Sequence, residues 1–511
     1  MQESQPVNRK MITISIMLAT LIQSLDGTIA NVALPHMQGS LSASSDQITW
    51  VLTSFIVAAA IATPLNGWLC DRFGLKKVFL VSVAGFTIAS VLCGISGTLV
   101  EIVLARVLQG MFGAALVPLS QSTLLDINPP EKHGSAMAVW GMGVMIGPIL
   151  GPTLGGWLTD AYDWRWVFFI NVPLGALAFY GILKYMRPTV GARRIRFDTF
   201  GFITLSLAIG ALQMLLDRGE QNDWFGSLET WVEALLLAMA AAYFIGHTLT
   251  RPAGQSFLDY RLLKNANYVT GLAFIFIVGL VLFATRALMP SMLQSLQGYP
   301  AALAGLVTAP SGLGTMIAML FVGKITGKVD FRILLAAGFA ITAFSLWQMT
   351  GYTIVLSQSD IIWPGIIQGL GLGLVFVPLS AATFATLTPA MRAEGTAIFS
   401  LVRNIGSSIG IALVQTLLTR NTQTAHASLA AQVSYANPAL HDAGIASVYN
   451  LSTNAGIAAL NVEVTKQASM IAYVDDYWLM MILTLAVIPL LLLVQKPKGA
   501  PVSPAEAVHI D

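Results

Sequence analysis

Two charged residues interrupt long apolar stretches of the sequence, and both could help to move a proton. Asp26 is the only charge in residues 11–35, and Arg106 is the only charge in residues 102–125. A carboxylate at bilayer depth costs ~2.5–3.5 kcal/mol on insertion scales, so hydrocarbon favours the neutral acid, and we expect Asp26 to bind and release a proton in the working pH range. Arg106 keeps its proton and needs an anion or carbonyl groups, and Asp26 is the natural partner. For each residue the alternative is a structural polar bond between two helices.

The composition places these residues in a polytopic membrane protein. The chain has 511 residues, of which 55% are hydrophobic and 10% are charged, whereas a soluble protein carries roughly 25% charged residues. Its mean hydropathy is +0.72. This balance excludes a disordered chain, a collagen-like fibre, a disulfide scaffold and a cytosolic enzyme.

Apolar stretches recur along the sequence at the length that crosses a bilayer, which is ~20 residues. Counting those interrupted by one ionisable residue, the sequence predicts fourteen transmembrane helices and an all-α membrane fold. The predicted spans are 11–35, 47–70, 78–100, 101–125, 134–159, 165–186, 199–217, 230–250, 266–290, 300–323, 333–355, 360–387, 395–419 and 477–495.

The basic residues predict the orientation. With a cytoplasmic N-terminus, 20 of the 27 Lys and Arg residues fall on the cytoplasmic side and 5 fall outside, while Arg106 and Arg403 lie within spans. This asymmetry follows the positive-inside rule, so we expect both termini in the cytoplasm. The cytoplasmic set includes Arg193, Arg194, Arg196, Lys496 and Lys498, and the outer set includes Arg286.

A repeat divides the chain into two related halves. Matched residues keep their order at offsets of 256 to 260, and the pairs are Gly67/Gly323, Gln109/Gln368, Pro118/Pro378, Thr123/Thr383, Pro129/Pro389 and Lys132/Arg392. They predict a six-helix half at 11–186, an inserted helix pair with flanking cytoplasmic loops at 187–265, and a second six-helix half at 266–495 with an extracytoplasmic loop at 420–473. Duplication around a central binding site is the design of secondary transporters.

Other kinds of chemistry lack a signature in the sequence. The six histidines show no metal-ligand spacing, and neither a catalytic Ser/His/Asp set nor a Walker motif is present, so ATP cannot drive this chain directly. We therefore expect no metal, no cofactor and no catalytic residues. A net charge of +2 also argues against a nucleic-acid partner.

Five motifs give the chain a resemblance to a known family. They are residues 25–35 (Leu-Asp-Gly-Thr-Ile-Ala-Asn-Val-Ala-Leu-Pro), Gly67-x3-Asp71-Arg72-Phe73-Gly74-x-Lys76-Lys77, Arg106-x2-Gln109-Gly110-x2-Gly113, Gly143-x3-Gly147-Pro148-x2-Gly151-Pro152-x2-Gly155-Gly156, and residues 164–173. With these motifs the sequence resembles the major facilitator superfamily over nearly its whole length. Within it the chain is most similar to the fourteen-span drug:proton antiporter group typified by EmrB and QacA.

The resemblance implies roles for the motifs. It implies that Arg106 takes part in proton transfer, and that the Gly/Pro motif of residues 143–156 seals the interface between the halves through close helix packing and kinks. Plain helix packing is the alternative for that motif. The motif of residues 67–77 would be a cytoplasmic latch in which Asp71 forms its contacts in the outward state only. Positive-inside anchoring explains its lysines equally well.

A substrate cavity can be inferred only by position. Gln23, Gln109, Phe112, Met142 and Met145 are candidate lining residues, and each could instead serve helix packing. Arg403 and Asn404, the polar pair of the second half, could contact substrate, form a gate or join two helices. Apolar and Met-rich walls would accept many amphiphiles.

From these features we expect a secondary active transporter of the bacterial inner membrane that exports hydrophobic or amphiphilic toxic compounds, and so confers drug resistance, in exchange for protons. The resemblance also implies a possible tripartite pump with a periplasmic adaptor (membrane fusion protein) and an outer-membrane channel. The loop at 420–473 could contact the adaptor or form a mobile cover over the outward mouth. The alternatives are an exporter of a single metabolite such as a siderophore or fatty acid, an importer, and a membrane-bound enzyme or sensor.

Overall fold

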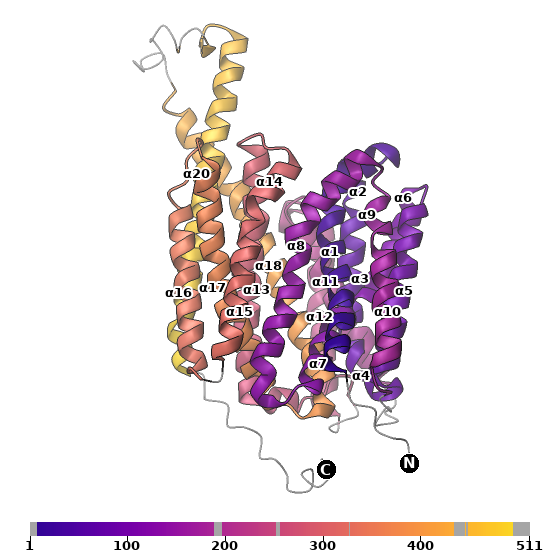
Figure 1. Ribbon diagram of the computed structural model, residues 1–511. Coiled ribbons are helices and arrows are strands. Elements are labelled where there is room, and N and C mark those ends of the chain that lie inside the picture. Colours follow the sequence, from indigo (N-terminus) through magenta and orange to yellow (C-terminus); the bar gives the residue numbers. More distant parts are fainter. Residues whose placement is uncertain are drawn as a thin grey trace, which may run out of the picture.

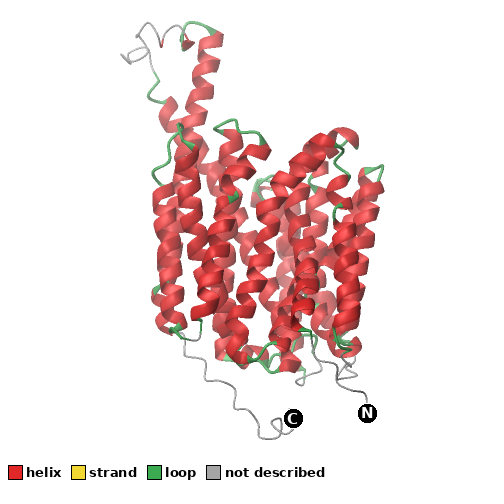
Figure 2. Ribbon diagram, in the orientation of Figure 1, coloured by secondary structure: helices red, strands yellow, loops and turns green. Residues whose placement is uncertain are grey.

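The computed structural model describes residues 8–188, 197–251, 256–326, 328–433, 445 and 448–493. Within these residues it consists of helices, joined by loops and one isolated bridge between Thr326 and Val329 (Figures 1 and 2). The predicted all-α fold is confirmed. The predictions that fall outside the described residues concern Arg193, Arg194, Arg196, Lys496, Lys498 and part of the stretch 420–473.

Two helical bundles stand side by side (Figure 1). The first contains α1 (Arg9–Ser40), α2 (Ser45–Ile48), α3 (Trp50–Ala62), α4 (Leu65–Phe73), α5 (Leu75–Ile95), α6 (Leu99–Gly113), α7 (Leu116–Ile127), η1 (Pro130–Lys132), α8 (His133–Ala161), α9 (Trp166–Phe169) and α10 (Asn171–Tyr185). The second contains η3 (Leu262–Lys264), α13 (Ala266–Ser295), α14 (Ala301–Thr308), α15 (Pro310–Ile325), α16 (Phe331–Met349), α17 (Gln358–Phe384), α18 (Pro389–Ala430), α20 (Asn454–Val487) and η5 (Pro489–Leu493). We call the end of the bundles where α1 begins and α20 ends the terminal face, and the opposite end the far face.

The predicted count of fourteen spans is confirmed. In the described part of the chain thirteen helices are long and apolar enough to cross a membrane, and the bent pair α3 and α4 makes fourteen when it is counted as one span. The two helices meet at an angle of 54° next to Pro64, which lacks the N–H group that would continue the helix. Two span ends were predicted at least five residues too late, because α5 ends at Ile95 rather than at residue 100 and α16 ends at Met349 rather than at residue 355.

The inserted helices α11 (Thr199–Arg218) and α12 (Leu228–Thr250), joined through η2 (Trp224–Gly226), lie against one side of both bundles. On α11, Ile209 packs with Ala60 of the first half and Leu401 of the second. Asp217 accepts a hydrogen bond from Thr53. Only 11% of the residues in the most apolar stretch of α12 are buried, so most of this helix faces lipid.

Asp198 holds the inserted helices together at the terminal face. It caps α11 by accepting from the backbone N–H of Gly201 (3.1 Å), and it also accepts from the N–H of Phe257 (3.1 Å) and pairs with His247 of α12 (2.9 Å). Burial alone would raise the pKa of Asp198, but these hydrogen bonds and the imidazole together lower it below the ordinary value. The carboxylate therefore stays ionised at neutral pH and joins both ends of the inserted pair.

The stretch at 420–473 is not simply a loop. Residues 420–430 continue α18 and residues 454–473 begin α20, and the two segments are joined by a 3.0 Å hydrogen bond between His426 and Asn461. With 42 residues, α18 is ~63 Å long, about twice the hydrocarbon thickness of a bilayer. The described segments, which we call the projecting hairpin, extend away from the bundle at the far face instead of covering it (Figure 1).

Candidate functional site

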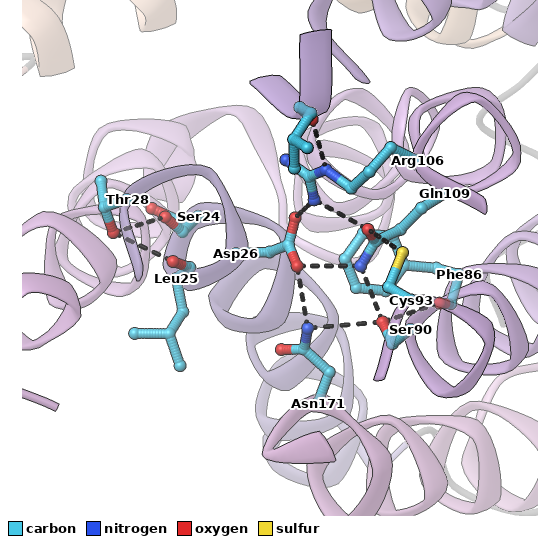
Figure 3. Close-up of polar contacts among 11 residues, drawn as sticks. Ser24, Leu25, Asp26, Thr28, Phe86, Ser90, Cys93, Arg106, Gln109 and Asn171 are labelled. Carbon is cyan, nitrogen blue, oxygen red and sulfur yellow. Dashed lines mark hydrogen bonds and ion pairs between the residues drawn. The ribbon is translucent and has the colours of Figure 1, made fainter. Parts of the chain in front are cut away.

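Asp26 and Arg106 form a buried ion pair in the middle of the first half (Figure 3). Arg106 Nη1 donates to Asp26 Oδ2 at 2.6 Å and to Gln109 Oε1 at 2.7 Å, while its Nε donates to the carbonyl of Val51 at 2.9 Å. The other carboxylate oxygen, Oδ1, accepts from Gln109 Nε2 at 2.8 Å and from Asn171 Nδ2 at 3.0 Å. The sequence-based pairing of Asp26 with Arg106 agrees with this geometry.

The arrangement suits an ionised carboxylate. Asp26 and Arg106 are at most 1% exposed, and the guanidinium carbon lies 4.2 Å from the centre of the Phe55 ring. Every hydrogen-bonding neighbour of Asp26 presents an N–H group, and both carboxylate oxygens are occupied. A buried charge is tolerated when it is paired and hydrogen-bonded in this way. The ion pair therefore links α1 to α6 inside the first half.

Asn171 and Ser90 belong to the site but were not among the predicted site residues. Asn171 Nδ2 also lies 3.3 Å from Ser90 Oγ, which accepts from Gln109 as well (2.8 Å) and donates to the carbonyl of Phe86 (2.9 Å). Asn171 lies at the start of α10 within the 164–173 motif, so the motif itself was the available signal. An Asn in an apolar span needs polar partners.

A cavity of about 450 Å³ lies between the two halves, toward the far face. Thr28, Asn31 and Pro35 of α1 line it from the first half, and Arg286 and Gln368 line it from α13 and α17 of the second half. Its volume falls within the range of small-molecule sites. Arg286, which the sequence analysis counted among the outer basic residues, therefore lies within a membrane span and faces this cavity.

None of the residues predicted to line a substrate cavity is among those that line this one. Gln109 belongs to the ion-pair network, Phe112 lies close against Gly85, and Met142 packs against the hydrophobic core. Gln23 of α1 and the pair Arg403 and Asn404, whose side chains are 3.3 Å apart, are also absent from the lining of this cavity. Met145 comes nearest, because its sulfur lies 3.6 Å from Arg286 Nη2.

The Gly/Pro motif of α8 contacts α1 on one side and the second half on the other. Gly143, Gly147, Gly151 and Gly155 lie against α1, where a Cβ atom on Gly147 would overlap Ser24 and one on Gly151 would overlap Thr28. Ser24 and Thr28 donate across this seam to the carbonyls of Val144 (2.6 Å) and Gly147 (3.1 Å). These four glycines thus join two helices of the same half, and the motif residues that face the second half are Pro148, Pro152 and Gly156.

The contact between the halves comes from other residues of α8 and its neighbours. Pro148 and Pro152 line the cavity, and Pro152 packs on Gly305 of α14. A Cβ atom on Gly156 would lie 3.4 Å from Ala302, at ordinary contact distance. Small residues at such crossings allow close approach of helices.

At the terminal face the two halves are in contact. A Cβ atom on Gly67 would come within 2.8 Å of Glu394 Cβ on α18, and Gly74 takes a φ of +83° between α4 and α5, a conformation that favours glycine. The side chain of Lys76 donates to the carbonyl of Leu183 (2.8 Å), and Arg72 lies 5.6 Å from the ring centre of Trp68. Asp71, the predicted latch residue, sits half-buried beside them.

A second ion pair crosses between the halves at this face. Arg392 Nη1 lies 2.7 Å from Asp126 Oδ1 and 3.3 Å from the carbonyl of Leu125. The sequence analysis did not select either residue, although Arg392 is the repeat counterpart of Lys132. Contacts between the halves thus occur at the terminal face, and the cavity lies toward the far face.

Comparison with known proteins identifies the family. Residues 16–411 match the family model described as Major Facilitator Superfamily. The chain belongs to the major facilitator superfamily. It is therefore a multi-pass membrane transporter and not an enzyme. No group of three or more His, Cys, Asp or Glu side chains that could hold a metal occurs in the described part of this transporter.

Relatives match this transporter along its whole length. It is 35% identical to the fatty acid resistance protein FarB of Neisseria gonorrhoeae, covering 95% of this chain and 96% of FarB. It is also 35% identical to the multidrug export protein EmrB of Escherichia coli strain K12, covering 98% of both chains. Among solved structures, the proton:xylose symporter XylE matches with a TM-score of 0.57 over 98% of both chains, at 14% identity. Identity that low shows a shared fold alone.

Proposed function

We propose that this transporter is a proton-driven efflux permease that exports hydrophobic or amphiphilic toxic compounds by alternating-access antiport. The carrying observation is the fully buried Asp26–Arg106 pair on a helix that also lines the cavity between the halves. The names of EmrB and FarB, a multidrug export protein and a fatty acid resistance protein, support export.

Coupling would run through α1. Asp26 lies two residues from Thr28, which both lines the cavity and donates to Gly147 of α8. Protonation of Asp26 weakens its attraction to Arg106, so α1 can shift against α6 and reshape the cavity at the same time. A proton that enters along the membrane potential supplies ~2.3 kcal/mol per 100 mV, in addition to the pH difference.

The remaining parts of the proposal concern location and partners. The terminal face, with both ends of the chain, would be cytoplasmic in a bacterial inner membrane, as the basic residues of the sequence indicate. The cavity would then open toward the periplasm. The projecting hairpin would be the contact for a periplasmic adaptor that leads to an outer-membrane channel, because it carries exposed apolar residues such as Val462 beyond the bundle.

The proposal is tested with inverted membrane vesicles whose interior is acidified by respiration. At least one of two probes, dodecanoate or a cationic dye, should release protons from vesicles that contain the wild type, and the Asp26→Asn variant should release none with either probe. Glu229→Gln is the control, because Glu229 forms an exposed ion pair with Arg218 on the inserted helices. Size-exclusion profiles establish that each variant is folded. Equal proton release by folded Asp26→Asn would contradict the proposal.

A narrower function has one observation in its favour. FarB, at 35% identity over 95% of this chain, is named for fatty acid resistance, so the second candidate is a dedicated exporter of one metabolite class such as a fatty acid. In the same vesicles, proton release by dodecanoate but by none of a panel of neutral and cationic drugs would favour this function over multidrug export.

A further inference from the structure

The cavity between the halves has an unusual balance of charge. Arg286 is the one charged residue among those that line it, and no Asp or Glu is among them. The other polar lining residues are amides and hydroxyl groups, and most of the wall is apolar, with Val32, Ile149, Phe283, Met289 and Ile411 among its members. A ligand in this cavity therefore meets a cation and hydrocarbon, and no anion.

Arg286 lacks an anionic partner within the described residues. Its one polar contact there is the sulfur of Met145 at 3.6 Å, and a thioether is only a weak acceptor. A guanidinium keeps its proton and presents five N–H donors in a plane, which fits a carboxylate in a bidentate manner. The half-buried side chain thus offers several donors toward the cavity.

Gln368 supplies a second and independent observation. The residue is 5% exposed, it lines the same cavity, and its buried Nε2 has no hydrogen-bond partner among the described residues. A buried N–H group without a partner costs free energy, so such groups in proteins commonly meet a ligand or water. Both unsatisfied groups are donors, and what they lack is an acceptor.

The internal repeat relates these two residues to the ion-pair site of the first half. Arg286 follows Asp26 at an offset of 286 − 26 = 260, and Gln368 follows Gln109 at 368 − 109 = 259, within the offsets of the other matched pairs. In the first half the guanidinium of Arg106 and the amide of Gln109 both donate hydrogen bonds to the carboxylate of Asp26. In the second half the arginine takes the place of the aspartate, and the lining provides no carboxylate.

We propose that the cavity binds an amphiphilic carboxylate, with its head group on the guanidinium of Arg286 and the amide of Gln368 and its hydrocarbon chain along the apolar wall. The proposal rests on the proposed export function and specifies its substrate class. A cationic amphiphile in the same place would face Arg286 without a counter-charge, so the cavity discriminates against it. Long-chain fatty acids and carboxylate drugs share the required chemistry.

The test is equilibrium binding to the full-length protein in lipid nanodiscs, without a proton gradient. Radiolabelled dodecanoate is the probe, and its competitors are the primary alcohol and the trimethylammonium compound with the same alkyl chain. Wild type should bind dodecanoate, and the trimethylammonium compound should compete weakly. Arg286→Gln should weaken dodecanoate binding at least about tenfold, as expected for loss of a charge-assisted hydrogen bond. Gln368→Met, which keeps the side-chain size, should weaken it less.

Two further variants keep the result interpretable. Arg286→Lys retains the charge without the planar fork, so its affinity should lie between those of wild type and Arg286→Gln. Arg218→Gln removes an exposed arginine of the inserted pair and should bind as wild type does. Dodecanoate binding that is unchanged in folded Arg286→Gln, or a trimethylammonium compound that binds wild type as tightly as dodecanoate, would overturn the proposal.

Failure here differs from failure of the proposed function. If dodecanoate does not bind but a cationic dye still releases protons through Asp26, the result supports the export function and contradicts the carboxylate site. If dodecanoate binds through Arg286 but neither compound releases protons, the site stands and proton coupling falls. Comparing dodecanoate with a carboxylate drug of similar size in the same assay separates fatty acids from drugs as the preferred source of the carboxylate.

Discussion

Individual charged residues in this transporter have different tasks according to their partners. Asp26 and Arg106 satisfy one another inside one half, whereas Asp126 and Arg392 connect the two halves at the terminal face. The second pair can exist only while that face is closed, because its members lie on α7 and α18. It therefore stabilises the conformation in which the cavity lies toward the far face.

Arg392→Gln should shift the population away from this conformation. The pair is partly exposed, with 14% and 37% of the two side chains accessible, so its contribution is at most ~1 kcal/mol, or about fivefold in the ratio of states. Labelling of an Asn31→Cys reporter in the cavity by a membrane-impermeant maleimide measures the shift. Background labelling is low because Cys70 and Cys93 are buried.

The charge swap Asp126→Arg with Arg392→Asp is the control for this shift. It restores an ion pair at the same place, so the Asn31→Cys labelling should return toward that of the parent protein. Labelling that is the same in Arg392→Gln as in the parent would show that the pair does not select the conformation.

At the scale of elements, the close seam between α1 and α8 links the Asp26–Arg106 pair to the cavity. Glycines of α8 leave no space for a side chain, and hydroxyl groups of α1 donate to backbone carbonyls across the seam. A seam of this kind makes two helices move as one unit, since packed interiors resist small changes in volume. Under the proposed coupling, a shift of α1 on protonation of Asp26 would be passed to α8 and its cavity-lining prolines.

Gly151→Ala should disturb this seam. Its Cβ would overlap Thr28 Oγ1, so α1 and α8 must separate, and overpacking of this kind costs ~1–3 kcal/mol. Gly27→Ala is the matched control, since nothing lies within 4 Å of a Cβ there and alanine favours a helix by ~0.5–1 kcal/mol. The unfolding temperature in detergent should fall for Gly151→Ala and should stay the same or rise for Gly27→Ala. Equal melting of both would refute the tight seam.

At the scale of the whole molecule, the projecting hairpin is the part that lies beyond the membrane-spanning bundles. Val462 on α20 is 66% exposed there, and the hydrogen bond between His426 and Asn461 holds the two helical segments together. Ile457 on the same helix is 48% exposed, so the described part of the hairpin offers exposed apolar side chains to a protein partner. The described part of the projecting hairpin therefore suits the proposed adaptor contact.

The adaptor contact predicts where cross-links form. A photo-reactive amino acid at position 462 should cross-link to an EmrB-type periplasmic adaptor, whereas one at Leu228, which is 79% exposed at the far end of the inserted helices, should not. Substrate transport in proteoliposomes that lack the adaptor should be the same for both substituted chains. Cross-links from Leu228 and none from position 462 would place the adaptor elsewhere.

The sequence by itself determined the fold class, the spans and the Asp26–Arg106 pairing. Bilayer thickness dictates the length of each apolar stretch, and the repeat offsets reveal the duplication. The pairing follows because Asp26 and Arg106 are the charges deep within the spans of the first half, and each needs a partner there. Hydropathy indicates a helix only where the helix crosses the bilayer. Residues 420–473 were therefore predicted to be a loop, although α18 and α20 continue into them.

Only the tertiary structure decided which residues face the cavity and which join the halves. An apolar helix surrounded by lipid on one side and protein on the other carries no strong periodic signal, so Gln109 and Gln368 look alike in the sequence. Gln109 packs inside its own half, whereas Gln368 lines the space between halves. Arg286 shows the same limit, because its position near a predicted span end suggested an outer loop. The packing of neighbouring helices determines which residues of a helix face the cavity, and that packing depends on contacts between residues far apart in the chain.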